Sequence, residues 1–439
     1  MFTGDRVDEF KGYLTTQLSN GKGSEVLKRI DKGIYKPSKK LMSHVSGIIK
    51  SKSEYNLLDE QLIVYDSVIA AAKKNLKSLK KTVIIVKGGS GTGKSVIAIN
   101  LMADLMKDGY NAHYATGSRA FTETLRTIIG TRGKDLFTYF NSYAKAEKNV
   151  IDVLICDEAH RIRQYSYSRF TAREDRTNIP QIQELINAAK VSVFFIDDDQ
   201  IVRPNEIGSA ALIKEYAENK NYVVKEYELE AQFRCNGSVG FTNWINNTLA
   251  IKRTANVIWE EKEEFDFKIL DTAEELQHAI QNKVKEGFTA RMTAGFCWNW
   301  SNPTPDGALV RDVSIGNFSM PWNAKPDANY LVSDIPKANL WAYDTKGINQ
   351  VGCIYTAQGF EFDYVGVIFG KDIVYDPTIA SWKGQKEFNF DSVVKRSGDK
   401  FLDLVKRTYR VLLTRGMKGC YVYFMDENTK NFFKSRIEK

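Results

Sequence analysis

The stretch VKGGSGTGKSVIAIN, from Val86 to Asn100, decides the fold of this chain. It follows the apolar run Thr82–Val86 and precedes a segment with the apolar spacing of an amphipathic helix. It matches G-x-x-x-x-G-K-[ST], in which glycines let the backbone turn its N–H groups toward a phosphate at the positive end of a helix. A strand, this loop and a helix in that order predict a phosphate-binding loop.

The same stretch supplies the residues expected to hold a nucleotide. Lys94 is expected to reach the β- and γ-phosphates, and Ser95 is expected to ligate Mg²⁺. The remaining contacts are expected from the loop itself, namely Gly88, Gly89, Ser90, Gly91, Thr92 and Gly93. The sequence therefore predicts a nucleotide bound together with Mg²⁺.

The composition is typical of a globular intracellular enzyme. The chain has 439 residues, of which 43% are hydrophobic and 26% charged, enough for two or three domains. Its formal net charge of +8 suits a nucleic-acid partner without requiring one. The five cysteines are scattered and odd in number, which indicates neither disulfides nor zinc, and no apolar run reaches the ~18 residues of a membrane helix. We expect a cytoplasmic protein that binds no membrane.

Strand and helix patterns alternate along most of the chain. Apolar strands are predicted at 83–86, 111–116, 150–158, 191–199 and 222–230. This alternation predicts an α/β fold with a parallel sheet covered by helices on both faces. The pattern blurs over about 290–345, which is rich in Pro, Asn and aromatic residues, and returns at 352–370 and 411–424. The predicted parts are a helical segment (1–55), a first domain (56–235) and a second domain (236–439) with an irregular insertion.

Acidic and amide side chains follow two of the predicted strands. In VLICDEAHR (153–161), Asp157 is placed to hold Mg²⁺ and Glu158 to orient or deprotonate an attacking water. Both lie at the carboxyl end of a strand, where α/β proteins build their sites. In FFIDDDQ (194–200), Gln200 is placed to sense the γ-phosphate, whereas Asp197–Asp199 fit a solvated turn equally well.

Two arginines are candidates for stabilising a transferring phosphoryl group. Arg234 lies in EAQFRCNGS (230–238), and Arg415 lies in YRVLLTRGMKG (409–419). An arginine supplied by a second domain can neutralise the charge that develops on that group. A lone arginine is more often part of a surface ion pair, so the order of the motifs along the chain carries this interpretation.

That order resembles a known superfamily. GGSGTGKS, DEAH, DDDQ, QFR, TAQGFEF and LLTRG look like motifs I to VI of superfamily 1 DNA/RNA helicases, and NLLDEQ (56–61) resembles their Q motif. GFCWNWS, YTAQGFEFDYVGVI and YRVLLTRGMKG are similar to the Schlafen-group helicase-like domain family. The resemblance runs from about residue 35 to the end. It implies two RecA-like P-loop NTPase domains that bind ATP between them, with single-stranded DNA or RNA across their tops.

The resemblance also implies roles for individual residues. The ATPase residues would be Lys94, Ser95, Asp157, Glu158, Gln200, Arg234 and Arg415, with Gln61 reading adenine and Glu361 contacting ribose. Thr356 and Gln358 would contact nucleic acid. HYATGS (113–118), which contains Thr116, matches the first strand-contacting motif only loosely, and FNSY (140–143) matches the next one weakly. Trp298 and Trp300 fit either base stacking or buried packing.

Three functions fit these observations. The first is an ATP-driven helicase or translocase on single strands, which we favour. The second is a regulatory ATPase switch, for example in antiviral defence. The third is a binder that does not hydrolyse ATP, against which Glu158 and both arginines argue. No nuclease or zinc constellation is visible in the sequence, so cutting would require a protein partner or a fused effector domain.

Overall fold

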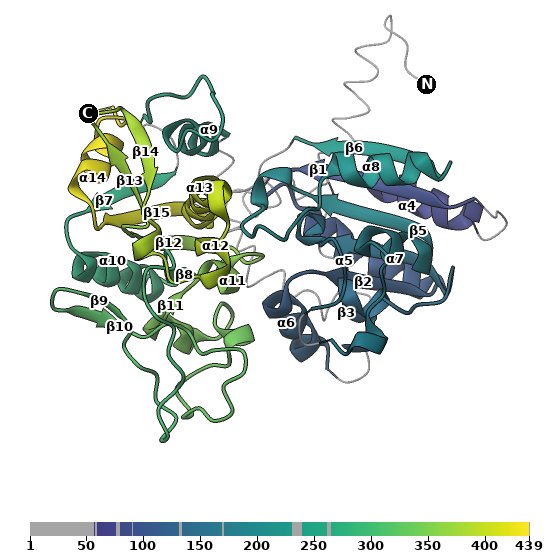
Figure 1. Cartoon of the computed structure of the whole chain (residues 1–439), viewed down its shortest axis with the longest axis horizontal. Helices are drawn as coiled ribbons and strands as arrows, with labels where there is room; N and C mark the ends of the chain where they lie inside the picture. The colour runs from purple at the N-terminus through teal and green to yellow at the C-terminus, as the bar shows by residue number, and fades with distance from the viewer. Residues whose placement is uncertain are drawn as a thin grey trace, which may run out of the picture. The chain divides into compact units, whose positions relative to one another are not determined.

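The structure is a computed structural model that describes residues 57, 59–75, 80–89, 91–130, 134–168, 171–230, 239–260 and 265–438. The predicted N-terminal segment (1–55) and two predicted site residues, Ser90 and Arg234, lie outside these ranges. The described part of the chain contains two mainly parallel sheets with helices packed on them (Figure 1). This confirms the predicted α/β class with two parallel sheets.

Six strands of the described chain form the first sheet, in the order β3-β2-β4-β5-β1-β6, and every neighbouring pair is parallel. The strands are β1 (Thr82–Gly88), β2 (Ala112–Thr116), β3 (Phe137–Tyr139), β4 (Ile151–Asp157), β5 (Ala189–Ile196) and β6 (Val223–Leu229). Five of them were predicted. The sequence pattern missed β3, because three residues are too few to show a period.

Helices cover both faces of this sheet. They are α4 (Asp59–Asn75), α5 (Lys94–Lys107), α6 (Arg119–Ile129), α7 (Gln181–Ala188) and α8 (Ala210–Asn219). Ile84 and Val86 of β1 pack with α4 and α5, whereas Val83 and Ile85 pack with α7 and α8. Successive side chains of a strand point to opposite faces, so the run VIIV fills both layers. We call this sheet with its helices the first lobe.

A buried lysine ties α7 to the start of β1. The Lys81 ammonium donates to the carbonyls of Ile186 (2.9 Å), Asn187 (3.0 Å) and Ala189 (2.6 Å) at the end of the helix. A cation there satisfies the last carbonyls of the helix and complements its dipole. The basic run 73–81 therefore includes one structural lysine and is not only a solvated face.

The second sheet has the order β11-β8-β12-β15-β7 and is also parallel. Its strands are β7 (Asp266–Leu270), β8 (Ala290–Ala294), β11 (Val351–Gly352), β12 (Phe362–Phe369) and β15 (Gly416–Phe424). The described helices near it are α9 (Val239–Thr248), α10 (Ala273–Lys285), α11 (Ile354–Ala357), α12 (Ser392–Lys395), α13 (Phe401–Leu413) and α14 (Glu427–Lys434). We call these elements the second lobe.

Strand β12 shows how this lobe builds two core layers. Its residues Tyr364 and Ile368 pack with Leu276 and Ile280 of α10, whereas Val365, Val367 and Phe369 pack with α13. All eight of its residues are buried, as in a central parallel strand.

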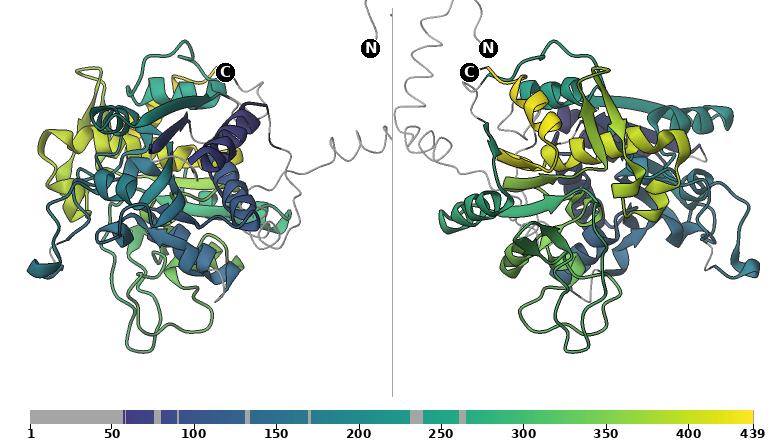
Figure 2. Two further views of the ribbon diagram at one scale, coloured as in Figure 1. Left: turned by 90° about the vertical axis from the view of Figure 1, so that its right-hand side faces the viewer. Right: turned by 60° about the vertical axis from the view of Figure 1, so that its left-hand side comes forward.

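Between β8 and β11 the chain is irregular. It contains the hairpin β9 (Val313–Ile315) and β10 (Phe318–Met320), the short helix η8 (Ala338–Leu340), and long loops drawn in green in Figures 1 and 2. A second hairpin, β13 (Ile373–Asp376) and β14 (Ser381–Gly384), follows β12. The predicted domain boundaries at 55/56 and 235/236 stay predictions.

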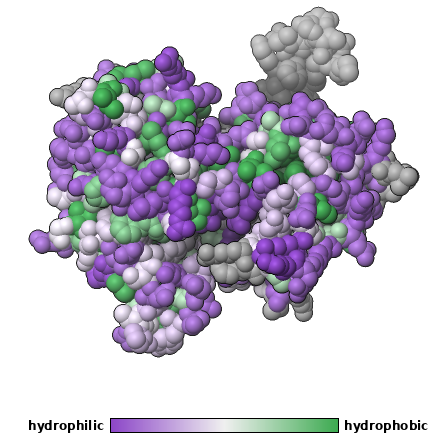
Figure 3. Space-filling model, in the orientation of Figure 1, coloured by the Kyte–Doolittle hydropathy of each residue, from purple (hydrophilic) through white to green (hydrophobic). Residues whose placement is uncertain are grey.

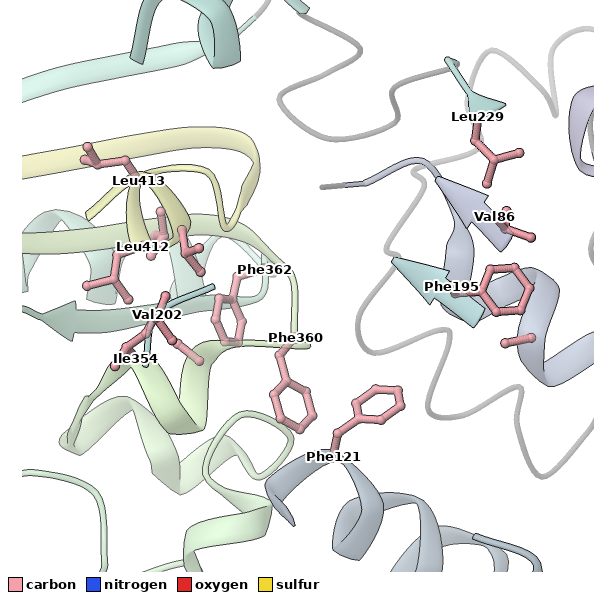
Figure 4. Packing of buried hydrophobic residues seen from close by; sticks show 14 of the residues in the cluster. Val86, Phe121, Phe195, Val202, Leu229, Ile354, Phe360, Phe362, Leu412 and Leu413 are labelled. Carbon is pink, nitrogen blue, oxygen red and sulfur yellow. The ribbon is translucent and has the colours of Figure 1, made fainter. Parts of the chain in front are cut away.

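Residues of both lobes share one apolar cluster (Figure 4). Phe121 of α6 meets Phe360, with ring centroids 5.8 Å apart. Val202 lies among Ile354 and Leu412 in the same figure. These contacts connect the segments before and after β12 with the first lobe.

The face shown in Figure 3 is mostly hydrophilic, with apolar residues in small groups. Among the described helices, none is both long enough and apolar enough to cross a bilayer.

Candidate active site

The loop between β1 and α5 forms a phosphate cradle. Gly93 caps α5 in the left-handed conformation, with φ 80°, and Gly91 has φ 91°. Side chains rarely adopt these angles, so glycine is required at both positions. At Gly88 an added Cβ would lie 2.5 Å from Oγ1 of Thr92, so the loop closes tightly on itself. The cradle opens at the positive end of α5, which suits a phosphate.

Four predicted residues lie together at this loop. The Lys94 ammonium donates to the carbonyls of Gly88 (2.7 Å) and Gly89 (2.6 Å). The hydroxyl of Ser95 donates to Asp157 Oδ2 at 2.6 Å. On α4, the amide of Gln61 donates to the carbonyl of Thr92 at 3.2 Å. The lysine, the hydroxyl, the carboxylate and the glutamine are thus brought to one loop, as predicted from sequence.

A hydroxyl next to a carboxylate suits Mg²⁺, which binds through few protein oxygens and keeps several waters. Tyr114 of β2 donates its phenol to the same oxygen that Ser95 contacts, Asp157 Oδ2, at 2.5 Å. Burial, and then the nearby charge of Glu158, raises the pKa of Asp157 against these hydrogen bonds. Mg²⁺ bound at Ser95 and Asp157 would relieve that charge and neutralise phosphate oxygens. No larger cluster of His, Cys, Asp or Glu suited to a metal occurs among the residues that the structure describes.

Glu158 lies directly after Asp157 at the carboxyl end of β4. It follows β4 in the left-handed conformation, with φ 55°, an uncommon angle for this residue type and one found at functional sites. Its Oε2 lies 2.9 Å from Nε2 of His160. Burial works to raise the pKa of Glu158, but the charges of His160, Arg161 and Lys94 outweigh it and hold the pKa below its ordinary value. A carboxylate that stays ionised is suited to orienting a water rather than to keeping its proton.

Gln200 and Arg415 meet across the lobes. The side-chain oxygen of Gln200 accepts from Nη2 of Arg415 at 3.3 Å, and its amide nitrogen donates to Asp197 at 2.8 Å. Arg415 is fully buried, and it also donates to the carbonyl of Phe360 at 3.2 Å. The predicted γ-phosphate sensor of the first lobe is therefore in direct contact with the predicted arginine of the second.

Gln358 is buried between the lobes, and its side-chain amide contacts three residues of the first lobe. Its side-chain oxygen accepts from Arg161, and its amide nitrogen donates to the carbonyl of Gln200 at 3.2 Å and lies 3.2 Å from Nε2 of His160. The side chain has no exposed area. This residue therefore connects the segments around Glu158 and Gln200 with the segment before β12.

The model of one protein family matches residues 81–426, a range that includes both sheets and the site residues above except Gln61. The chain belongs to the family Schlafen group 3, DNA/RNA helicase domain.

Other proteins are similar to this helicase-type domain over much of its length. An uncharacterized protein of Saccharomyces cerevisiae (strain ATCC 204508 / S288c), YPL245W, is 25% identical over 459 residues, which cover 93% of this chain and 97% of that protein. Among solved structures, Pif1 helicase from Candida albicans is 12% identical, with 87% of this chain and 99% of that chain covered and a TM-score of 0.36. AMPPCP-bound DnaA from Aquifex aeolicus is 17% identical, with 46% and 56% covered and a TM-score of 0.22.

The helicase-type domain also contains site residues that the sequence pattern missed. Arg410 of α13, five residues before Arg415, is 3% exposed and donates to Asn246 Oδ1 at 2.7 Å. Its Nη2 lies 3.9 Å from Asp199, and its Nη1 is a buried nitrogen with no hydrogen-bond partner. Arg410 of α13 thus brings a cation in addition to Arg415 to the first lobe. Tyr114 was missed as well, because a tyrosine within an apolar strand is expected to pack in the core, and the sequence does not show where its hydroxyl lies.

Other predicted residues lie away from the loop. Glu361 is half-buried between the two backbone groups that contact Arg415. Thr356 is buried and donates to Asn323 Oδ1 at 2.9 Å. Trp298 is half-buried, donates to the carbonyl of Ser314 at 3.0 Å, and packs against Trp322. Its packing role is therefore visible, whereas its contact with nucleic acid stays a prediction, like that of Thr356.

A polar pocket of about 420 Å³ lies at the carboxyl ends of β2 and β3. Thr116 lines it, as do Arg119, Tyr139, Asn141, Arg161 and Arg163. Gly117 makes room for Arg161, because an added Cβ would lie 2.5 Å from the Cβ of that arginine. Burial, and then the nearby charge of Arg203, lowers the pKa of Arg163, although Glu206 opposes this. Several guanidinium groups so close together favour an anion.

Proposed function

We propose that this helicase-type domain hydrolyses ATP and uses the hydrolysis to move along single-stranded DNA or RNA. The observation that carries this proposal is the direct contact between Gln200 of the first lobe and Arg415 of the second. In P-loop ATPases a glutamine and an arginine at such positions act on the γ-phosphate and its attacking water. A contact between lobes that depends on the γ-phosphate would couple hydrolysis to lobe movement.

The residues of both lobes have distinct roles in the proposed reaction. The cradle and Lys94 bind the phosphates of ATP, and Glu158 orients the attacking water. Arg415 stabilises the charge that develops on the transferring group, while Gln200 senses the γ-phosphate. Gln61 is placed beside the loop for an adenine contact, and Glu361 for the ribose. Ser95 and Asp157 would hold Mg²⁺.

The polar pocket supports a strand-binding role for the first lobe. It combines arginines, a tyrosine and an amide at the carboxyl ends of the strands. Arginine side chains contact phosphates and stack on bases, and aromatic rings stack on bases. Gln358 connects Arg161 of this pocket to Gln200, so a strand in the pocket and a nucleotide at the loop would affect the same hydrogen bonds.

A second candidate function is a regulatory ATPase switch. The apolar contacts between the lobes, including the ring contact of Phe121 with Phe360, favour it, because such contacts do not depend on a bound nucleotide. A chain whose lobes stay associated would report its ATP state through a smaller rearrangement, to a protein partner or a fused effector domain. We propose the cytoplasm as its compartment, which agrees with four described cysteines that form no disulfide.

The test is ATP hydrolysis by the purified chain with no nucleic acid, with single-stranded DNA and with single-stranded RNA. Glu158→Gln serves as the matched variant, because it keeps the size of the side chain and removes its charge. We expect single strands to raise turnover and the variant to lose roughly a hundredfold or more in kcat. Turnover that depends on Glu158 but ignores both strands would reject the motor and support the switch.

A further inference from the structure

In the segment from 385 to 396 of the second lobe, aromatic side chains are exposed and polar side chains are buried. This segment includes the short helix η10 (Lys386–Phe388) and α12, and we call it the aromatic loop. Phe388 is 41% exposed and Phe390 44%, whereas the polar side chains Asn389 and Asp391 are buried. Large aromatic residues are normally the ones that folding buries.

Hydrogen bonds hold this arrangement in place. The amide of Asn389 donates to Asp372 Oδ2 at 2.9 Å, and its oxygen accepts from the backbone of Asp391 at 2.9 Å. Asp391 caps α12 by accepting from the N–H groups of Val393 (2.9 Å) and Val394 (3.2 Å). The backbone is therefore fixed on both sides of Phe390, and the two rings are presented by a supported loop.

Positive charge surrounds the two rings. The exposed charged residues of the aromatic loop are Lys386, Glu387, Lys395 and Arg396, three cations against one acid. The ammonium of Lys395 lies 6.0 Å from the centre of the Phe390 ring. Exposed aromatic rings combined with cations are the usual construction of a single-strand binding surface, where bases stack and phosphates pair with lysine or arginine.

The aromatic loop is connected to the polar pocket of the first lobe. Asp391 accepts a hydrogen bond from the phenol of Tyr355 in α11. The guanidinium of Arg203 lies 3.7 Å from the centre of that Tyr355 ring. Arg203 precedes Glu206, which forms a backbone bridge with Arg163 of the pocket. Contacts thus run from Arg163 of the pocket to the aromatic loop, through the segment 203–206 and Tyr355.

We propose that the aromatic loop is a base-stacking site for the single strand that the polar pocket binds, with Phe388 and Phe390 as its stacking rings and Lys386 and Lys395 as its phosphate contacts. This inference rests on the proposed strand-binding function and assigns part of the strand to the second lobe. A protein partner could also cover exposed rings, but the three cations and the connection to the arginine-lined pocket favour a polyanion.

The test is strand binding by the full chain without ATP, measured by fluorescence anisotropy with labelled oligo-dT, oligo-U and an abasic strand of equal length. Phe388→Ala and Phe390→Ala should each weaken binding of oligo-dT or oligo-U about tenfold, and Phe390→Trp should restore it. Phe390→Leu should behave like alanine, because leucine offers no ring for stacking. Ile379→Ala is the matched control, since Ile379 is an exposed apolar residue (63%) on the neighbouring hairpin.

Two further measurements, the salt dependence and the affinity for the abasic strand, distinguish stacking from other effects. The phenylalanine variants should leave the slope of log Kd against log salt unchanged, whereas Lys395→Ala should reduce it by about one. On the abasic strand, wild type and Phe390→Ala should bind equally. Because both rings are exposed, these variants should fold normally.

The outcomes distinguish this inference from the function on which it rests. If the wild-type chain binds no strand, the strand-binding function and this inference both fail. If the wild type binds and the double variant Phe388→Ala/Phe390→Ala binds equally well, only this inference fails and the loop is left for a protein partner. Equal losses on the abasic and the base-bearing strands would also overturn stacking.

Discussion

Replacing Gln358 by methionine tests whether this residue couples the lobes or contacts nucleic acid. Methionine keeps the length of the side chain and removes the amide. The sequence resemblance predicts a strand contact, whereas the structure places the side chain with no exposed area between Arg161, His160 and Gln200. The two interpretations make different kinetic predictions.

The magnitude follows from the hydrogen bonds that are lost. Removal of the amide leaves the buried Arg161, a charged donor, without this acceptor, and it leaves the carbonyl of Gln200 without this donor. A hydrogen bond to a charged group contributes about 1.5–3 kcal/mol and a neutral one about 0.5–1.5 kcal/mol. If only about 1–2 kcal/mol of this total is specific to the closed state, kcat falls roughly 5- to 30-fold.

The assay compares ATP turnover at saturating ATP with strand affinity measured without ATP. For Gln358→Met we expect kcat to fall in that range and Kd for oligo-dT to change less than threefold. Gln350→Met is the matched control, because Gln350 is a buried glutamine of the same lobe (2% exposed) that is not among the residues that contact Gln358.

The opposite result would refute the reasoning. If Gln358→Met binds the strand tenfold more weakly while kcat at saturating ATP and strand stays at the wild-type value, the amide acts on nucleic acid. If both glutamine variants lose activity equally, the loss reflects a damaged second lobe. Thermal unfolding of the two variants identifies that case.

Two further predictions concern residues that support the site. Tyr114→Phe removes a hydrogen bond from Asp157, so it should raise the Mg²⁺ concentration for half-maximal turnover about 10- to 100-fold and leave kcat at saturating Mg²⁺ near wild type. The control Tyr143→Phe removes another buried phenol of this lobe and should not change this concentration. Equal Mg²⁺ curves for the two variants would contradict the role of Tyr114 in supporting Asp157. Lys81→Met should lower stability by about 2–4 kcal/mol, or roughly 5–15 °C in Tm, because three carbonyls at the end of α7 lose their donor. The exposed Lys80→Met is its control, and similar melting curves for the two variants would reject the structural role.

The predicted site residues that the structure brings together at the loop belong to short motifs that are local in the chain. The cradle is a run of eight residues whose glycines, lysine and serine are each required by one short turn, so a motif is sufficient to find it. Asp157 is the last residue of β4, a parallel strand that only β5 separates from β1, and the carboxyl ends of parallel strands lie at the same edge of the sheet as the loop. The alternation of strands and helices predicted the class of fold for the same reason.

The parts that sequence missed depend on contacts between distant segments. Tyr114 occupies an ordinary strand position, and only the pairing of β2 with β4 places its phenol on Asp157. Arg410 lies in α13, five residues before Arg415, but the contacts of α13 with the first lobe decide that its guanidinium faces Asp199. Strand β8 contains a buried arginine, Arg291, whose charge masks the apolar pattern of a central strand.

The interface between the lobes combines two kinds of contact with different consequences for a motor. The Phe121–Phe360 pair and Val202 contribute apolar burial, which has no direction and does not respond to a phosphate. The hydrogen bonds at Gln200 and Gln358 are directional, and they end at groups that a nucleotide would also contact. A ligand changes an equilibrium only by its differential affinity for two states, so ATP can act on the second kind of contact and not on the first. In the proposed motor, the apolar pair would therefore limit how far the lobes part, and the two glutamines would determine when they part.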